Sequence, residues 1–438
     1  MRFRRTALAL AFSAALGTAN ASDLINVYRD ALVSDPVYQS SRAQYAATIE
    51  ALPQARSGYL PNVGASANYF RNRVDEDVAG KFDYTSKGYA VTLSQPIFRM
   101  QNWISIGQAE KVVFQAETTL AGAVQDLIIR VAQAYFDVLL AQDNVVLSGA
   151  QKVAISEQLA QAKRNFEVGT ATIVDTLEAQ ARYDQADAKE ISDKNDLEVK
   201  KHALAVLIGK FPEGLTPLRE PLALAPPQPN DMQEWVTVAS DSSVAIINAR
   251  ASVDIAQKEI GRQRAGYAPT LDLSASYTRT DNPTNIVPGL TGPFTNAGAV
   301  GLLLSVPIYQ GGLTNSQVRQ AVANRDRAEQ DLENARRTVW QSVRTNFLNV
   351  TSGIAQVRSL EQALTSTQSQ LDSTILGRDV GVRTSVDVLN AQQQVFQTRR
   401  DLQQARYNYL LSTLRLKAAA GTLTEKDVED VNRTLAKG

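Results

Sequence analysis

The sequence contains no cysteine and a single histidine, His202. Disulfides and thiolate metal sites are therefore excluded. His202 lies in a stretch that we expect to be helical, beside Lys200 and Lys201, where a solvated helix residue is the simplest interpretation. No second histidine completes a metal site, a Ser-His-Asp triad would need that same residue, and no glycine-rich phosphate loop follows a strand. The sequence thus predicts no enzyme, with no catalytic residue, no metal and no cofactor.

The chain also lacks net charge, because 45 basic side chains balance 45 acidic ones. A nucleic-acid partner is not expected, since binding phosphates requires a basic face. A polybasic lipid-binding segment is not expected for the same reason.

A long apolar run is missing as well. No segment after the N-terminus has about 18 consecutive apolar residues, so we expect no membrane-spanning helix. The N-terminus itself has arginines at positions 2, 4 and 5, an apolar stretch over 7–16, and Ala19-Asn20-Ala21. This order is typical of a signal peptide, so we expect cleavage of residues 1–21 and a mature chain beginning at Ser22. An exported chain of this kind is either soluble or a β-barrel, whose strands need only about 10 residues with every second one apolar.

The remaining sequence is duplicated, and this organises the chain. Val168-Gly169 recurs as Val380-Gly381, and Gly209 recurs as Gly421. Further matches are Gly58-Tyr59-Leu60-Pro61 with Gly266-Tyr267-Ala268-Pro269, and Pro96-Ile97-Phe98 with Pro307-Ile308-Tyr309. We therefore expect two structural repeats, at residues 22–230 and 231–438.

Each repeat contains two stretches in which apolar residues alternate with small or polar ones, the pattern of half-buried strands. They predict two β-hairpins, over 59–98 and 267–309, with loops at 72–83 and 282–295 that are rich in Asp, Asn, Gly and Pro. Four strands cannot close a barrel, and an open edge in lipid leaves backbone groups unpaired. Copies must therefore combine, as a dimer with eight strands or a trimer with twelve. A wide lumen, and hence the trimer, suits the small residues of one face: Gly64, Ser66, Gly88, Ala90, Ser274, Ser276 and Gly301.

Long helices connect the hairpins. Residues 101–168 lack proline, and apolar residues recur every seventh position, as in Val343, Val350, Val357, Leu364 and Leu371. This is a coiled-coil pattern, and helices over 100–168 and 311–379 would each be about 100 Å long. We expect return helices over 171–209 and 384–420, and helices before each hairpin, including one over 23–57. A Pro-rich segment at 210–230 and the segment 421–438 occupy matching midway positions.

Several of these motifs, in order on the duplicated frame, resemble the TolC family of outer-membrane efflux and secretion channels. They are Gly266-Tyr267-Ala268-Pro269-Thr270-Leu271-Asp272-Leu273, Pro307-Ile308-Tyr309-Gln310-Gly311-Gly312, Val380-Gly381-Val382-Arg383-Thr384, Val386-Asp387-Val388-Leu389 and Ala405-Arg406-Tyr407-Asn408-Tyr409-Leu410. The resemblance implies an α+β membrane protein in which each chain gives four strands to a trimeric 12-stranded β-barrel and its helices to a long coiled-coil α-helical barrel.

The resemblance also implies a location and partners. The barrel would lie in outer-membrane lipid of a Gram-negative bacterium, with the helices in the periplasm. The homotrimer would work with a periplasmic adaptor protein and an inner-membrane transporter of the ABC or RND type. Type I protein secretion and multidrug efflux use the same duct, and the sequence does not choose between them. A barrel-anchored structural spacer of the envelope that transports nothing is the alternative.

The turns between the long helices carry the candidate site. Gly169 and Gly381 suit helix ends, and Thr172-x-x-Asp175 and Thr384-x-x-Asp387 suit capping boxes that open the next helix. The resemblance places these turns at the periplasmic tip. It implies adaptor docking at Val168, Gly169, Thr170, Val380, Gly381 and Val382. It implies a periplasmic gate at Asp175, Arg378, Arg383, Asp387 and Asn390.

Two of the gate positions depart from the family pattern. Arg378 stands where the family's best-known member has a tyrosine that ties the closed tip, and Asn390 stands where it has a second ring aspartate. We therefore expect a more ionic closing network, with Arg383 able to pair with Asp175, and a less acidic mouth.

Overall fold

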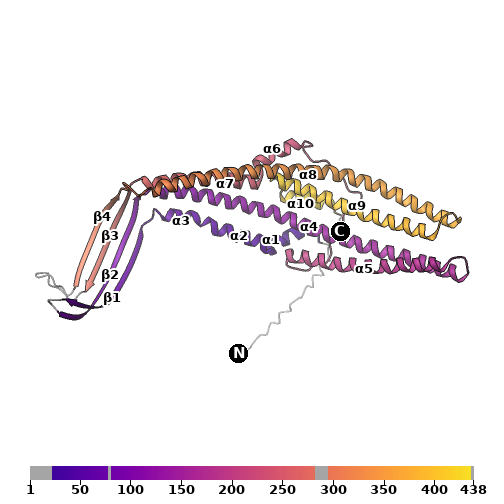
Figure 1. Ribbon diagram of the computed structural model, residues 1–438, viewed down its shortest axis with the longest axis horizontal. Coiled ribbons are helices and arrows are strands. Elements are labelled where there is room, and N and C mark those ends of the chain that lie inside the picture. The colour runs from indigo at the N-terminus through magenta and orange to yellow at the C-terminus, as the bar shows by residue number, and fades with distance from the viewer. Residues whose placement is uncertain (1–21, 77–79, 282–293, 436–438) are drawn as a thin grey trace, which may run out of the picture. The chain divides into compact units, whose positions relative to one another are not determined.

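The computed structural model describes residues 22–76, 80–281 and 294–435 (Figure 1). The chain forms two compact units, and each is assembled from separate stretches of sequence. One unit comprises Ser40–Gly122 and Ser240–Trp340, and the other comprises Met1–Gln39, Ala123–Ala239 and Gln341–Gly438. The first unit contains the sheet and is called the strand unit below. The second contains the ends of the long helices and is called the helix unit.

The four strands of the strand unit form one antiparallel sheet in the order β1-β2-β3-β4 (Figure 1). They are β1 Asn62–Glu76, β2 Gly80–Phe98, β3 Thr270–Asp281 and β4 Phe294–Ser305. The register aligns small residues with small residues: Gly64 lies opposite Thr92, Thr92 opposite Ser276, and Ser276 opposite Ala299. One face of the sheet is therefore lined by small and polar side chains, as the alternating pattern predicts.

The first hairpin is longer than predicted, and the loop expected over 72–83 is wrong. β1 and β2 pair as far as Glu76 and Gly80. Charged residues hold this extension together, because the Arg73 guanidinium contacts Asp83 at 2.7 Å and Lys81 Nζ contacts Asp75 at 2.9 Å across the ladder. Polar composition signalled a turn here, but cross-strand ion pairs also suit such residues to an exposed ladder. Most of the second predicted loop, 282–293, lies outside the described residues, and its positions 294 and 295 begin β4.

The helices follow the predicted plan with different boundaries. The long helices are α4 Met100–Glu167 and α8 Leu313–Asp379, and the return helices are α5 Ile173–Ile208 and α9 Ser385–Ala420. The shorter ones are α6 Met232–Ser242, α7 Val244–Arg264 and α10 Glu425–Asn432, with a 3-10 turn over Ala265–Tyr267. The helix expected over 23–57 is broken into α1 Leu24–Ser34, α2 Pro36–Ile49 and α3 Ala51–Ser57. Pro36 explains the first break, because the residue before a proline avoids helical geometry.

Heptad positions form the core of the helix unit. Leu371 on α8 packs with Val388, Ala391 and Val395 on α9, and Val357 packs with Leu402 further along the same pair. Within the described residues, α4 is long and apolar enough to cross a membrane by length and composition, contrary to the expectation that no helix would be. One such helix is a weak indication, because core helices of soluble proteins and signal sequences can have the same length and composition.

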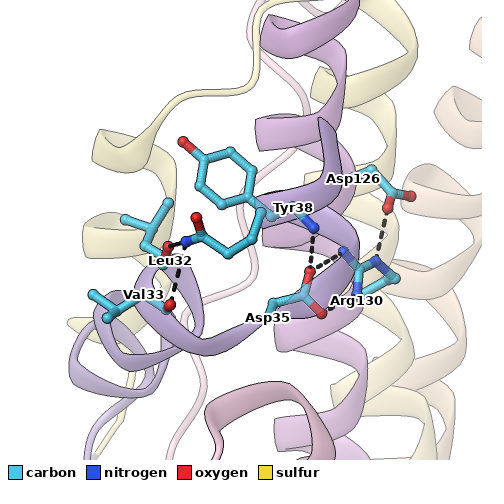
Figure 2. A network of polar contacts seen from close by, with 7 residues as sticks. Leu32, Val33, Asp35, Tyr38, Asp126 and Arg130 are labelled. Atoms are coloured by element: carbon cyan, nitrogen blue, oxygen red, sulfur yellow. Dashed lines mark hydrogen bonds and ion pairs between the residues drawn. The ribbon is translucent and has the colours of Figure 1, made fainter. Parts of the chain in front are cut away.

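A buried ion pair fastens the break between α1 and α2 to α4 (Figure 2). The Asp35 side chain is 2% exposed, and its two oxygens accept from Arg130 at 3.1 and 2.7 Å. Asp35 also accepts from the backbone N–H of Tyr38 at 2.9 Å, so it caps α2. Arg130 in turn reaches Asp126 at 2.7 Å on its own helix. The hydrogen bonds from Arg130 lower the pKa of Asp35 below its usual range.

Distant parts of the sequence meet at one place in the helix unit. Ser22 pairs as an isolated bridge with Leu215, and Leu218 pairs with Leu435. The hydroxyl of the fully buried Tyr135 donates to the Thr216 carbonyl at 2.9 Å beneath them. The Pro-rich segment is therefore held between residues from both ends of the described chain.

Candidate functional site

The turns after α4 and α8 have the same backbone structure. Gly169 and Gly381 adopt φ of 78° and 82°, in the left-handed region. In the first turn the Gly169 N–H donates to the Phe166 carbonyl at 3.0 Å, and the Thr170 N–H donates to the Asn165 carbonyl at 2.8 Å. The corresponding distances from Gly381 and Val382 in the second turn are 3.0 and 2.8 Å. This is a Schellman ending, which satisfies the last carbonyls of a helix.

Conformation alone requires glycine at these two positions. A Cβ built on Gly169 or Gly381 meets no other atom within 4 Å, so a side chain has room. A positive φ strains other residues, and β-branched ones most of all.

Each turn leads into a helix through a capping box, as predicted. The Thr172 hydroxyl accepts from the Asp175 N–H at 3.3 Å, and the Asp175 carboxylate accepts from the Thr172 N–H at 2.9 Å. Thr384 and Asp387 repeat this exchange at 3.1 and 2.9 Å. The bonds from the Thr backbone and then from the Thr hydroxyl lower the pKa of each aspartate. Both carboxylates are therefore charged and held in place at neutral pH.

The predicted docking residues form an exposed apolar edge on the turns. The side chains of Val168, Val380 and Val382 are exposed by 73%, 66% and 74%. Thr170 is also exposed, and its hydroxyl bonds to the Asn165 carbonyl at 3.1 Å. Each turn thus presents valine around a glycine whose conformation the helix ending fixes.

The predicted gate residues fall into two groups. Arg383, Asp387 and Asn390 line one groove of about 780 Å³ along α8 and α9. The charge of Arg383 contributes to the lowered pKa of Asp387, after the capping bonds. The other groove residues are mostly hydroxyl and amide side chains: Thr367, Gln370, Ser373, Thr374, Gly377, Val382, Ala391 and Gln394.

Asp175 and Arg378 are not part of that group. Asp175 lies at the start of α5, and its carboxylate is occupied by the capping box. Arg378 contacts its neighbour Asp379 at 2.8 Å. Within the described part of a single chain, neither Arg378 nor Arg383 forms an ion pair with Asp175, so that pairing remains a prediction about the assembled tip.

One residue of this region was not predicted from the sequence. Arg182 on α5 donates to the Gln393 side chain at 3.0 Å and to the Asn390 side chain at 3.1 Å on α9 (Figure 1 shows the two helices). Asn390 thus has a partner on the other helical hairpin. Nothing in the sequence places positions 182 and 390 together, because the contact depends on how two separate hairpins pack.

A sheet with two unpaired edges in the described residues, together with long helical hairpins that have matching capped turns, is what a subunit of an outer-membrane channel is expected to contain. The chain belongs to the family described as outer membrane efflux protein, which matches residues 27–210 and 235–422.

The relatives and solved structures agree with this family. The chain is 37% identical to the outer membrane protein TolC of Vibrio cholerae, with 98% of each chain covered. It is 30% identical to the alkaline protease secretion protein AprF of Pseudomonas aeruginosa, with 95% of this chain and 88% of the relative covered. The fold is that of the Vibrio cholerae outer membrane protein VceC, with a TM-score of 0.76 at 19% identity over 91% of this chain and 96% of that one.

These comparisons confirm the TolC-family resemblance and the mixed fold of long helices and a four-stranded sheet. They place the chain in the outer membrane of a Gram-negative bacterium, in a family of channels.

Proposed function

We propose that the chain is one protomer of a trimeric exit duct that crosses the outer membrane and continues through the periplasm to a gated tip. The observation that carries this proposal is the sheet. It has a small-residue face, and the outer edges of β1 and β4 are unpaired in the described residues. Such edges need partners in lipid, and other copies of the chain supply them.

The trimer is favoured over the dimer by the width of the lumen. Residues on the small face, such as Gly64, Ser66 and Ser276, fill little space when they point inward. An eight-stranded barrel has an interior that side chains fill, whereas a twelve-stranded one leaves an open channel lined by small side chains. The small face therefore supports three copies and an open duct.

Exposed aromatic and aliphatic residues at the junctions between strands and helices indicate where the edge of the membrane would lie. Trp103, Ile308 and Tyr309 are exposed by 60%, 96% and 86%, and Phe98 at the end of β2 is also exposed. The ring centroid of Tyr59 lies 5.0 Å from that of Trp103. Amphipathic aromatic rings at the ends of membrane strands form the girdles that fix a barrel's depth. These residues would lie at the periplasmic edge of the membrane.

The gate and the docking edge belong to the turns at the far ends of the helices. Arg383, Asp387 and Asn390, together with Asp175 and Arg378, would line or tie the mouth. The exposed valines around Gly169 and Gly381 would contact a periplasmic adaptor. An inner-membrane transporter of the ABC or RND type would deliver cargo through that adaptor. A relative named for protease secretion supports polypeptide cargo by type I secretion, and the family name supports multidrug efflux.

Planar-bilayer recording of the purified protein tests the duct. A trimer inserted in lipid should show stepwise single-channel conductance that increases when Arg383 is replaced by serine. A structural spacer would insert without conducting, so a correctly assembled protein that never conducts would contradict the proposal.

A further inference from the structure

Arg182 joins the two helical hairpins of the helix unit through neutral partners. Its guanidinium bridges Gln393 and Asn390 on α9 with one nitrogen for each. The nearest carboxylate is that of Glu178, one turn earlier on α5, at 3.6 Å. The side chain of Arg182 is 27% exposed, so the bridge is partly accessible to water. Of the hydrogen bonds described between the hairpins, the one to Asn390 involves the residue of α9 closest to its capping box.

α9 contacts its two neighbours in different ways. Toward α8 its contact near the tip is apolar, through Val388, Ala391 and Val395, and an ion pair of Arg406 with Glu361 at 3.1 Å lies further along the same two helices. Toward α4 and α5 the contact near the tip is largely polar, and it includes Gln392 with Gln158 at 2.6 Å as well as the Arg182 bridge. Further along α9, Arg400 contacts Asn144 at 3.2 Å, and the buried ring of Tyr407 stacks on Phe136 while its hydroxyl donates to Asp143 at 2.8 Å. One small apolar cluster, Ile155 with Ala186 and Leu389, lies among these contacts.

This difference in chemistry has a mechanical consequence. Separating α9 from α8 would expose apolar surface to water, which is costly. Separating α9 from α5 near the tip exchanges hydrogen bonds to amides for hydrogen bonds to water and exposes only the small cluster of Ile155, Ala186 and Leu389, so it costs less net free energy. The hairpin of α8 and α9 therefore holds together, and its contact with α5 is the one suited to open.

We propose that Arg182 is a positioning residue of the periplasmic tip that latches α9 to α5 through Asn390 and Gln393. This inference rests on the gated duct proposed above and names a residue that controls it. Asn390 is the neutral acceptor that keeps the latch releasable. An aspartate at position 390 would convert the contact into an ion pair with Arg182 and hold α9 more tightly.

A double-mutant cycle tests the latch, using Arg182→Gln, Asn390→Asp and the double variant. Three latches act in a trimer, so Arg182→Gln should raise the open fraction in planar bilayers about tenfold. Asn390→Asp should lower the open fraction, and the double variant should return to the level of Arg182→Gln. Multivalent cations should block the Asn390→Asp channel no more strongly than the wild-type channel, because Arg182 neutralises the new carboxylate. Stronger block should appear only in the double variant, which lacks Arg182.

The matched control is Lys194→Gln. Lys194 lies on α5, is 60% exposed and pairs with Glu190 of the same helix, which keeps Lys152 as a second partner, so its removal should leave the open fraction unchanged. Arg182→Lys provides a second variant that keeps the charge. Because a lysine cannot bridge both amides in a fixed fork, we expect an effect between wild type and Arg182→Gln. An equal effect of Lys194→Gln would overturn the latch in favour of a general charge effect.

A readout that does not depend on conduction separates this inference from the duct itself. Because the chain lacks cysteine, spin labels can be placed at the exposed positions Ala181 and Gln394 without background. Arg182→Gln in the detergent-solubilised protein should broaden and lengthen the distance distribution between α5 and α9. An unchanged distribution overturns the latch even if the channel conducts. A broadened distribution in a protein that never conducts supports the latch and contradicts the duct.

Discussion

At the scale of single residues, the tip turns depend on two glycines whose role is conformational. Gly169 and Gly381 combine positive φ with free space around the Cβ position, so a substitution acts on the shape of the turn and on no neighbouring side chain. A substitution at either glycine changes the position of the exposed valines beside it but not their chemistry. Such a substitution can therefore separate adaptor docking, which depends on the shape of the turn, from trimer assembly.

We expect Gly169→Val and Gly381→Val to impair adaptor binding while the trimer still assembles. A β-branched residue at positive φ costs about 1–2 kcal/mol locally, which favours a distorted turn. Adaptor co-purification and native mass spectrometry measure the two effects. Gly149→Val is the matched control, because Gly149 also has free space but lies inside α4 without positive φ. Wild-type adaptor binding and export with valine at both turns would remove these turns from the adaptor interface.

The charged residues of the tip differ in how free they are to act on the mouth. Arg383 lines the groove with Asp387 and Asn390, whereas Arg378 is engaged by its neighbour Asp379. Arg383→Ser should therefore raise the resting conductance in planar bilayers, and Arg378→Ser should raise it less. A solvated ion pair contributes at most about 1 kcal/mol, and three of them in a trimer together are enough to favour the closed state of the gate. Equal conductance of Arg383→Ser and wild type would show that Arg383 does not tie the tip.

At the scale of elements, the ion pair of Asp35 with Arg130 joins a helix break to a long helix. Asp35→Ala removes both the cap of α2 and the partner of a largely buried arginine. We expect a loss of about 2–4 kcal/mol in the free energy of unfolding, measured by denaturant titration. Asp126→Ala removes the exposed partner of the same arginine and should cost at most about 1 kcal/mol. Similar losses in the two variants would mean that burial does not distinguish the two contacts.

The same pair gives the unfolding curve a dependence on pH. The pKa of Asp35 is lowered on folding, so its contribution is complete at a pH above the usual aspartate range. The contribution disappears as the pH falls through the lowered pKa. Asp35→Asn should therefore be less stable than wild type at neutral pH and should lose less stability on acidification.

The elements themselves were largely predictable from sequence, for reasons that differ between helix and strand. Heptads such as Val343, Val350 and Val357 predicted the long helices because a buried seam repeats every seven residues. Alternation predicted the sheet because a strand exposes opposite faces in turn. The break at Asp35 could have been predicted from Pro36. The hairpin extension to Glu76 could not, because its polar residues suit a turn or an exposed ladder equally well.

The candidate site was predictable only within each turn. The glycines and capping boxes are local patterns, and the structure contains both. The contact of Arg182 with Asn390 joins two hairpins and has no local pattern. The pairing of Arg383 with Asp175, the adaptor-docking role of the valines and the two-repeat boundaries remain predictions.

At the scale of the whole molecule, we expect a mature trimer that begins at Ser22 and carries no lipid. The Ser22 N–H donates to the Gly214 carbonyl at 2.9 Å, so the expected first residue of the mature chain is held in the helix unit. Intact-mass and native mass spectrometry of the protein extracted from outer membranes measure both properties. A retained 1–21 segment, an acyl adduct or a stable soluble monomer would each count against this expectation.

The meeting of distant segments in the helix unit constrains the order in which the protein can fold. The Ile25 N–H donates to the Asn432 side chain, and Asn432 donates to Asp23 at 3.0 Å, across sequence separations of 407 and 409 residues. Contacts this distant carry a large loop-closure entropy and form slowly. In an exported chain that emerges with residue 22 first, α1 can pack on α5 early, but its contacts with residues near 432 can form only after those residues have crossed the inner membrane. This part of the fold is therefore completed last, and we expect the chain to depend on periplasmic chaperones that hold incompletely folded chains.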